Sequence, residues 1–217
     1  FQHGGSKEFT SVDERIGVRV AIIYRFLSEN LRYINIAKHY ITLMAIEKIF
    51  ERFLGPAYGY GKVGGKSAGM ILAEQILNVK KQKIPILENV KTPKSWFLTS
   101  DGILEFINYN ALDEFNYVKY QSLEHINLEF SFIEYIFKNS KFTPEAMNAF
   151  NIILDDLEGK PIVIRSSSLL EDSFEAAFTG KYKSLFISNV GTKEERLNSL
   201  TNAIAEVYAS TLGPDPI

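Results

Sequence analysis

The sequence has no cysteine, which excludes disulfide bonds and thiolate metal sites. The longest apolar runs, such as residues 20–24, are far short of the roughly 20 residues that a helix needs to cross a bilayer. No basic-then-apolar signal segment opens the chain, so we expect a cytoplasmic protein without a membrane partner. The three histidines, His3, His39 and His125, show no arrangement with serine or acid residues that would indicate a catalytic triad.

An excess of charge of one sign is also lacking. The net charge is -2, from 24 basic and 26 acidic residues, which argues against a nucleic-acid binder that depends on phosphate contacts. The hydrophobic fraction of 46% across 217 residues is enough to form a real core. The length fits one substantial domain or two small ones.

The first quarter of the chain has helical periodicity. Apolar residues recur every three or four positions over residues 12–30 and again over residues 36–53. These two stretches predict an antiparallel helical hairpin, which ends at Gly55 and Pro56. We therefore expect a helical extension over residues 1–55 and a separate domain over residues 56–217.

Helices and strands are interleaved in the second part. A helix is expected over about residues 67–79, a short strand over 95–99, and then a helix to about residue 110 that Ser100 or Asp101 would cap. Thr143 and Pro144 indicate the start of another helix, and residues 161–166 and 181–187 are typical of strands. A capping box, Thr192 with Glu195, opens the last helix. This order predicts an α+β (or α/β) domain behind the helical extension.

The first candidate for binding chemistry is a glycine-rich loop that ends in Gly64, Gly65 and Lys66. Glycines let backbone N–H groups approach phosphate oxygens, a following helix adds a partial positive charge, and a lysine adds a full one. A P-loop is disfavoured because Tyr60 occupies the position of the first required glycine. An ordinary turn before a helix remains the alternative.

The second candidate is the end of the strand over residues 161–166. Alternation places Arg165 on the face opposite Ile162 and Ile164, followed by the hydroxyl groups of Ser166 and Ser167. An arginine there can hold a phosphate through two parallel hydrogen bonds. The alternative is an ion pair between Arg165 and an acidic residue, Glu171 or Asp172.

The third candidate is the segment over residues 171–180, which links the two expected strands. It holds Glu171, Asp172 and Glu175 and ends in Thr179 and Gly180. One interpretation is a mobile loop over a nucleotide, and the other is a solvated surface loop. No matching cluster of ligands accompanies the acids, so no metal site is expected from them.

Together these segments resemble one family. Residues 63–69, 92–100, 163–172 and 178–182 are similar, in order and spacing, to segments of phosphoenolpyruvate synthases and pyruvate phosphate dikinases. The resemblance covers about residues 60–217 and implies the first half of an ATP-grasp nucleotide-binding domain. It further implies that Lys66 and Arg165 are catalytic and contact the phosphates of ATP. It places the remaining nucleotide contacts on Gly64, Gly65, Ser166, Ser167, Thr179 and Gly180.

The family's chemistry moves a phosphoryl group from ATP to a histidine on a swivelling domain, and from there to pyruvate. The resemblance implies MgATP as the nucleotide, and pyruvate or phosphoenolpyruvate as partners through other domains. The magnesium-binding acids are expected in a second half that would follow residue 217, so we expect this chain alone to be inactive. An apolar face at the end of the last helix would favour a homo-oligomer. The alternative function is a non-catalytic regulatory or interaction module that kept the fold.

Overall fold

The computed structural model describes residues 11–56, 61–157, 159–167 and 183–214. The chain forms two compact units. The helical unit comprises Phe1–Arg52 and Ser67–Ser95, and the mixed unit comprises Phe53–Lys66 and Trp96–Ile217. The predicted division at residue 55 stays a prediction, and most of the helix that follows the glycine-rich loop groups with the N-terminal helices.

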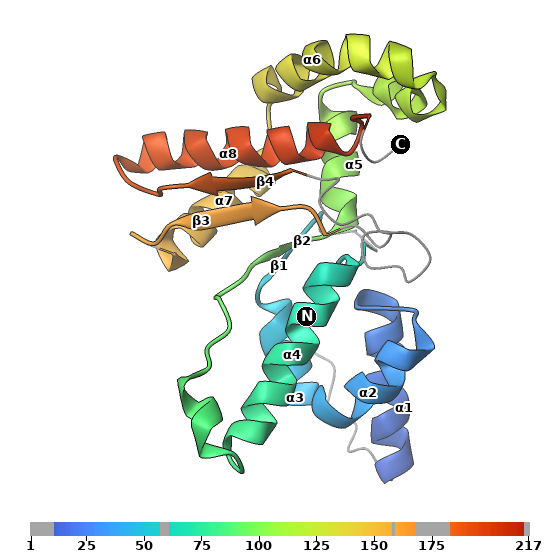
Figure 1. The fold of residues 1–217 in the computed structure, drawn as a ribbon, viewed down its shortest axis with the longest axis vertical. Helices are drawn as coiled ribbons and strands as arrows, with labels where there is room; N and C mark the ends of the chain where they lie inside the picture. The colour runs from blue at the N-terminus through green and yellow to red at the C-terminus, as the bar shows by residue number, and fades with distance from the viewer. Residues whose placement is uncertain (1–10, 57–60, 158, 168–182, 215–217) are drawn as a thin grey trace. The chain divides into compact units, whose positions relative to one another are not determined.

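The helical unit contains α1 (Val12–Phe26), α2 (Leu31–Tyr40), α3 (Leu43–Phe50), most of α4 (Gly65–Lys81) and the 3-10 helix η1 (Pro85–Asn89). The prediction of a single helix over residues 36–53 is wrong, because the chain breaks at Ile41 and Thr42. Ile41 has extended backbone angles, and the Thr42 side chain caps α3 by accepting a hydrogen bond from the Ala45 N–H. The predicted hairpin is therefore three helices within the described part of residues 1–55 (Figure 1).

Polar contacts join α4 to the earlier helices of this unit. The Tyr33 hydroxyl donates to the Ala68 carbonyl at 2.8 Å, and Arg52 pairs with Glu74 at 3.1 Å. Burial raises the pKa of Tyr33 well above its ordinary value, so the hydroxyl keeps its proton as a donor. These contacts join the first ten residues of α4 to α2 and to the segment that follows α3.

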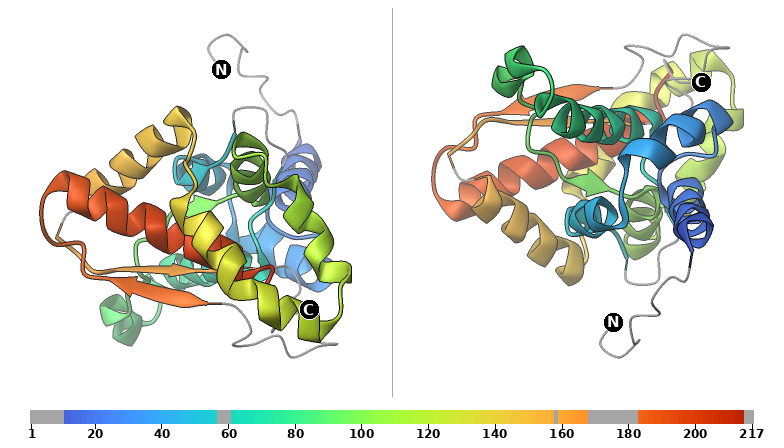
Figure 2. Two further views of the ribbon diagram at one scale, coloured as in Figure 1. Left: turned by 90° about the horizontal axis from the view of Figure 1, so that it is seen from above. Right: turned by 90° about the horizontal axis from the view of Figure 1, so that it is seen from below.

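The described residues of the mixed unit form two small sheets. Strand β1 (Phe53–Leu54) pairs in parallel with β2 (Phe97–Leu98), and β3 (Ile162–Arg165) pairs antiparallel with β4 (Ser184–Ile187). Its helical elements are α5 (Ser100–Tyr109), the 3-10 helix η2 (Asp113–Tyr120), α6 (Leu123–Asn139), α7 (Pro144–Asp156) and α8 (Lys193–Ser210). Helix α8 packs along the β3–β4 pair, as Figures 1 and 2 show. This arrangement confirms the expected α+β class.

Local capping signals start two of these helices where the sequence predicts. Thr143 accepts a hydrogen bond from the Ala146 N–H at the start of α7. Thr192 and Glu195 form the reciprocal capping box of α8. These caps depend on residues three positions apart, so the sequence alone carries the signal.

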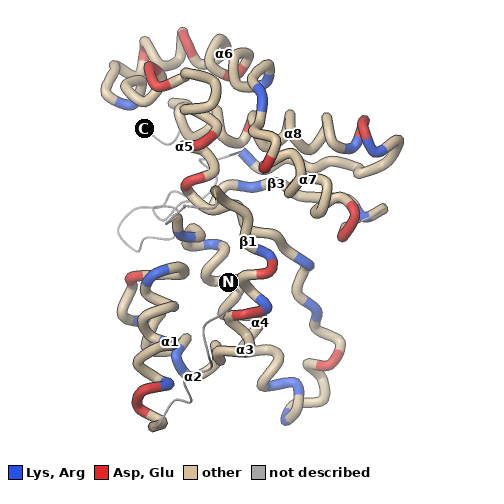
Figure 3. The backbone as a smooth tube through the Cα atoms, turned by 180° about the vertical axis from the view of Figure 1, so that it is seen from behind, with Lys and Arg blue, Asp and Glu red and all other residues tan. Residues whose placement is uncertain are grey.

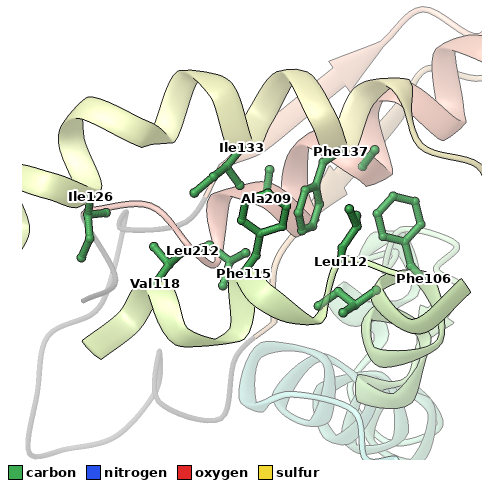
Figure 4. Packing of buried hydrophobic residues seen from close by; sticks show 11 residues of the cluster. Phe106, Leu112, Phe115, Val118, Ile126, Ile133, Phe137, Ala209 and Leu212 are labelled. Carbon is green, nitrogen blue, oxygen red and sulfur yellow. The ribbon is translucent and has the colours of Figure 1, made fainter. Parts of the chain in front are cut away.

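Two apolar clusters stabilise the mixed unit. The first joins α5, η2, α6 and α8 around Phe106, Phe115, Ile133 and Phe137 (Figure 4). The second joins α7 and α8 to the strands and is built on residues that include Phe150, Ile153, Leu154, Leu157, Leu200 and Ile204. Trp96 packs against this second cluster, and its indole N–H donates to the Asp156 carboxylate at 2.8 Å.

Charged residues of both signs are interspersed along the described chain (Figure 3). One group forms a network between α6, α8 and the residue before β4. Glu206 accepts from Lys138 at 2.6 Å and from Lys183 at 3.1 Å, and Lys183 also pairs with Glu134. Burial alone would raise the pKa of Glu206, but hydrogen bonds from the two lysines outweigh burial and lower it. Burial likewise opposes the charge of Lys183, yet its two carboxylate partners raise its pKa.

Glu206→Gln tests the contribution of this network. Because the folded-state pKa of Glu206 is depressed, its contribution is present above the unfolded pKa near 4.5 and is lost as pH falls through the folded value. We expect the variant to lose about 1 kcal/mol at pH 7, since the pairs are partly exposed. Urea denaturation followed by circular dichroism should show the deficit at pH 7, and the deficit should shrink as the pH falls below 4.5. Glu114→Gln, at an exposed position, is the matched control, and an equal loss in both variants would contradict the prediction.

Candidate phosphate-binding site

The glycine-rich loop is anchored to the start of α5. The Lys62 carbonyl accepts a hydrogen bond from the Ser100 N–H at 3.2 Å, and the Gly61 N–H donates to the Asp101 carboxylate. Val63 is 1% exposed and holds the loop by burial. The prediction that Ser100 or Asp101 caps α5 is wrong, because Thr99 is the N-cap and makes no side-chain capping bond. Asp101 instead accepts from the loop, 40 residues earlier in the chain.

The loop meets the end of β3 at Gly64. A Cβ atom on Gly64 would overlap the Ser167 carbonyl oxygen, so the two backbones lie against each other and leave no room for a side chain. Helix α4 begins at the next residue, Gly65, with Lys66 as its second residue. The structure therefore brings the first two candidate segments together, about 100 residues apart in sequence.

Arg165 is the last residue of β3 and is exposed, whereas Ile162 and Ile164 are half-buried against the second cluster. This confirms the predicted alternation of the strand. Arg165 has no ion-pair partner among the residues that the structure describes. The alternative partners, Glu171 and Asp172, lie outside the described residues.

The remaining candidates divide into two groups. Lys66, Ser166 and Ser167 are half-buried, beside the Gly64 contact or next to it in sequence. Thr179 and Gly180 lie outside the described residues. The described site thus combines a close backbone approach, the amino end of a helix and two cationic side chains in adjoining segments.

This donor set suits an anion. The amino end of α4 carries the positive end of the helix dipole. Lys66 and Arg165 add full positive charge to the same pair of segments. The same site does not suit a metal ion. The described residues contain no group of three or more His, Cys, Asp or Glu side chains placed to hold one.

Sequence reasoning missed the roles of Asp101 and the Ser167 carbonyl. Both act on the loop across long stretches of chain, Asp101 through its carboxylate and Ser167 through its backbone. The glycines of the loop are the signal in the sequence that points to this packing. A run of glycines indicates that another backbone approaches closely, but it does not identify which segment that is.

The comparisons with known proteins agree with this geometry. The family model for the pyruvate phosphate dikinase, AMP/ATP-binding domain, matches residues 60–217, which include the loop and both strands of the β3–β4 pair. Searches of curated proteins and of solved structures found no match. In the described residues, no helix has the length and apolar character to cross a membrane. Because the family match spans most of the sequence and includes the Gly64–Ser167 junction, the chain belongs to the pyruvate phosphate dikinase AMP/ATP-binding domain family.

Proposed function

We propose that the chain binds the phosphates of ATP at the Gly64–Ser167 junction, as the ATP-binding part of a phosphoenolpyruvate synthase or pyruvate phosphate dikinase type of phosphotransferase. The observation that carries the proposal is the backbone contact itself. It places a helix start with Lys66 beside a strand end with Arg165, within a chain whose family is described as AMP/ATP-binding.

In this proposal each residue of the site has a separate task. The N–H groups at Gly65 and Lys66 donate hydrogen bonds to phosphate oxygens at the amino end of α4. Lys66 and Arg165 neutralise the charge that spreads over the transferring phosphoryl group, which is the main contribution a protein makes to such a transfer. The Ser166 and Ser167 hydroxyl groups supply further hydrogen bonds, and the Thr179–Gly180 segment covers the phosphates.

The acceptor of the phosphoryl group is proposed to be a histidine on a separate carrier domain, which then passes the group to pyruvate. Within the chain, His125 pairs with Glu129 at 3.1 Å on α6 and does not belong to the site. Magnesium would accompany ATP and lower the charge of its phosphates, but the described residues offer it no ligand cluster.

A second candidate function is a non-catalytic module that binds nucleotide and a protein partner. An open apolar groove of about 710 Å³ along α1 and α2, lined by residues that include Val18, Ala21 and Leu31, favours this candidate. The two functions differ in outcome: transfer of a phosphoryl group from ATP to a histidine in the full-length protein supports the phosphotransferase and excludes the non-catalytic module.

Calorimetric titration of MgATP tests the phosphate site. We expect Lys66→Ala and Arg165→Ala each to weaken binding by about tenfold or more, because each removes a charge-assisted contact to phosphate. Lys80→Ala removes the same charge as Lys66→Ala from an exposed position near the other end of α4 and should leave the affinity unchanged. Equal affinities for all four proteins would refute the assignment of these two residues.

A further inference from the structure

The mixed unit contains a cavity of about 120 Å³, which shares no lining residue with the Gly64–Ser167 junction. Its walls come from β1 and β2, from α5 and from the facing sides of α7 and α8. The volume is of the same order as that of an engineered cavity of ~150 Å³ that holds benzene. A ligand of a few heavy atoms would therefore fill the cavity.

Aromatic rings form much of the cavity wall. Phe142 lies at the centre of this group, 4.7 Å from the Phe106 ring and 5.1 Å from the Phe150 ring, measured between centroids. The Tyr208 ring stands edge-on to Phe106 at 5.7 Å. The faces of such rings carry partial negative charge, so a cation that contacts a ring face in this cavity is attracted to it.

The charged residues that line the cavity are both acidic. Glu105 of α5 and Glu145 of α7 contribute to the wall, and no lysine or arginine does so among the described residues. The amino end of α7 opposes them, but its dipole amounts to only about half a charge and Thr143 already binds one of its N–H groups. The charge balance of the cavity is therefore negative.

The Tyr208 hydroxyl adds a neutral polar group. A Cβ atom on Gly102, which also lines the cavity, would lie 3.0 Å from this oxygen. Burial, and then the nearby charge of Glu105, raise the pKa of Tyr208 far above its ordinary value. The hydroxyl group therefore keeps its proton and adds no third negative charge.

We propose that this cavity is a binding site for a small organic ammonium ion, held by the Phe106, Phe142 and Tyr208 rings and by the carboxylates of Glu105 and Glu145. A quaternary or alkylated ammonium group suits both the aromatic rings and the acidic side chains of the lining. Its methyl groups pack against the rings while its charge faces the carboxylates. An anion is disfavoured by the two acids, and a neutral ligand gains only the apolar contacts.

The experiment compares two ligands of similar shape, tetramethylammonium and tert-butanol. Each is titrated into the chain while the amide signals of Gly55 and Gly102, which line the cavity, are followed by NMR. We expect saturable shifts with tetramethylammonium and at least about fivefold weaker binding of the alcohol. Absence of saturable shifts with the cation, or equal affinity for both ligands, would overturn the proposal.

Two variants separate this site from a general attraction of cations to the protein. Glu105→Gln keeps the shape of the side chain and removes its charge. We expect it to weaken the binding of tetramethylammonium by about fivefold and to leave the binding of tert-butanol unchanged. Glu194→Gln removes the same charge from an exposed position on α8 that does not line the cavity, and should change neither affinity. Equal weakening by both variants would show that the attraction is not local. The test is independent of ATP, so it succeeds or fails apart from the proposed phosphate site.

Discussion

Gly64→Ala is expected to destabilise the mixed unit by about 2–3 kcal/mol, the range of an overpacked interior contact, and to abolish measurable MgATP binding. The added Cβ atom would overlap the Ser167 carbonyl oxygen, and a backbone atom cannot rotate away as a side chain can. The backbone of Gly64 is not in the left-handed region, so this clash alone accounts for the expected effect. Urea denaturation followed by circular dichroism measures the stability, and calorimetry measures the binding.

Gly69→Ala provides the matched control. Gly69 lies inside α4, five residues further along, and a Cβ atom there would have nothing within 4 Å. Because alanine is a better helix former than glycine, we expect this variant to gain about 0.5–1 kcal/mol and to keep its MgATP affinity. A Gly64→Ala protein as stable as the Gly69→Ala protein would mean that the loop and the strand end do not touch.

Phe137→Ala is expected to cost about 3–5 kcal/mol of stability, more than Gly64→Ala. The side chain is fully buried in the cluster of Figure 4, with ring centroids 5.5 Å from Phe106 and 6.1 Å from Phe115. Its removal leaves a cavity that helices from several parts of the chain must close. The free energy of unfolding from urea denaturation measures the loss.

Phe132→Ala makes the same chemical change on the same helix, α6. Its side chain is 60% exposed, so we expect a change within about 0.5 kcal/mol. Both variants replace phenylalanine by alanine inside α6, so the change in helix propensity is the same in each. The difference between their losses of stability therefore measures the contribution of burial. Similar losses in the two variants would contradict the packing of this cluster.

The parts of the fold that sequence predicts well are those determined by neighbouring residues. Thr143 and Thr192 mark helix starts through contacts three positions away, and alternation alone places Arg165 on the exposed face of β3. The break at Thr42 was missed because apolar periodicity continues across it, although a threonine before an apolar run is a capping signal.

The site was predictable in its components but not in its assembly. Lys66 and Arg165 were expected to act together from family resemblance, yet no local pattern indicates that Gly64 packs against Ser167. The sequence predicts that Ser100 or Asp101 caps the helix that follows, because such residues are common at helix starts, and only the folded chain brings Asp101 to the Gly61 N–H. The predicted homo-oligomer and cytoplasmic location stay predictions.

Trp96, whose indole N–H donates to Asp156, is the only tryptophan in the sequence and lies within the mixed unit. Its fluorescence emission therefore reports on the folding of that unit and not on the helical unit. Circular dichroism, by contrast, sums the helices of both. If emission and ellipticity follow the same thermal transition, the two units melt as one cooperative structure, whereas separate transitions would reveal a protein that loses one half while the other stays folded.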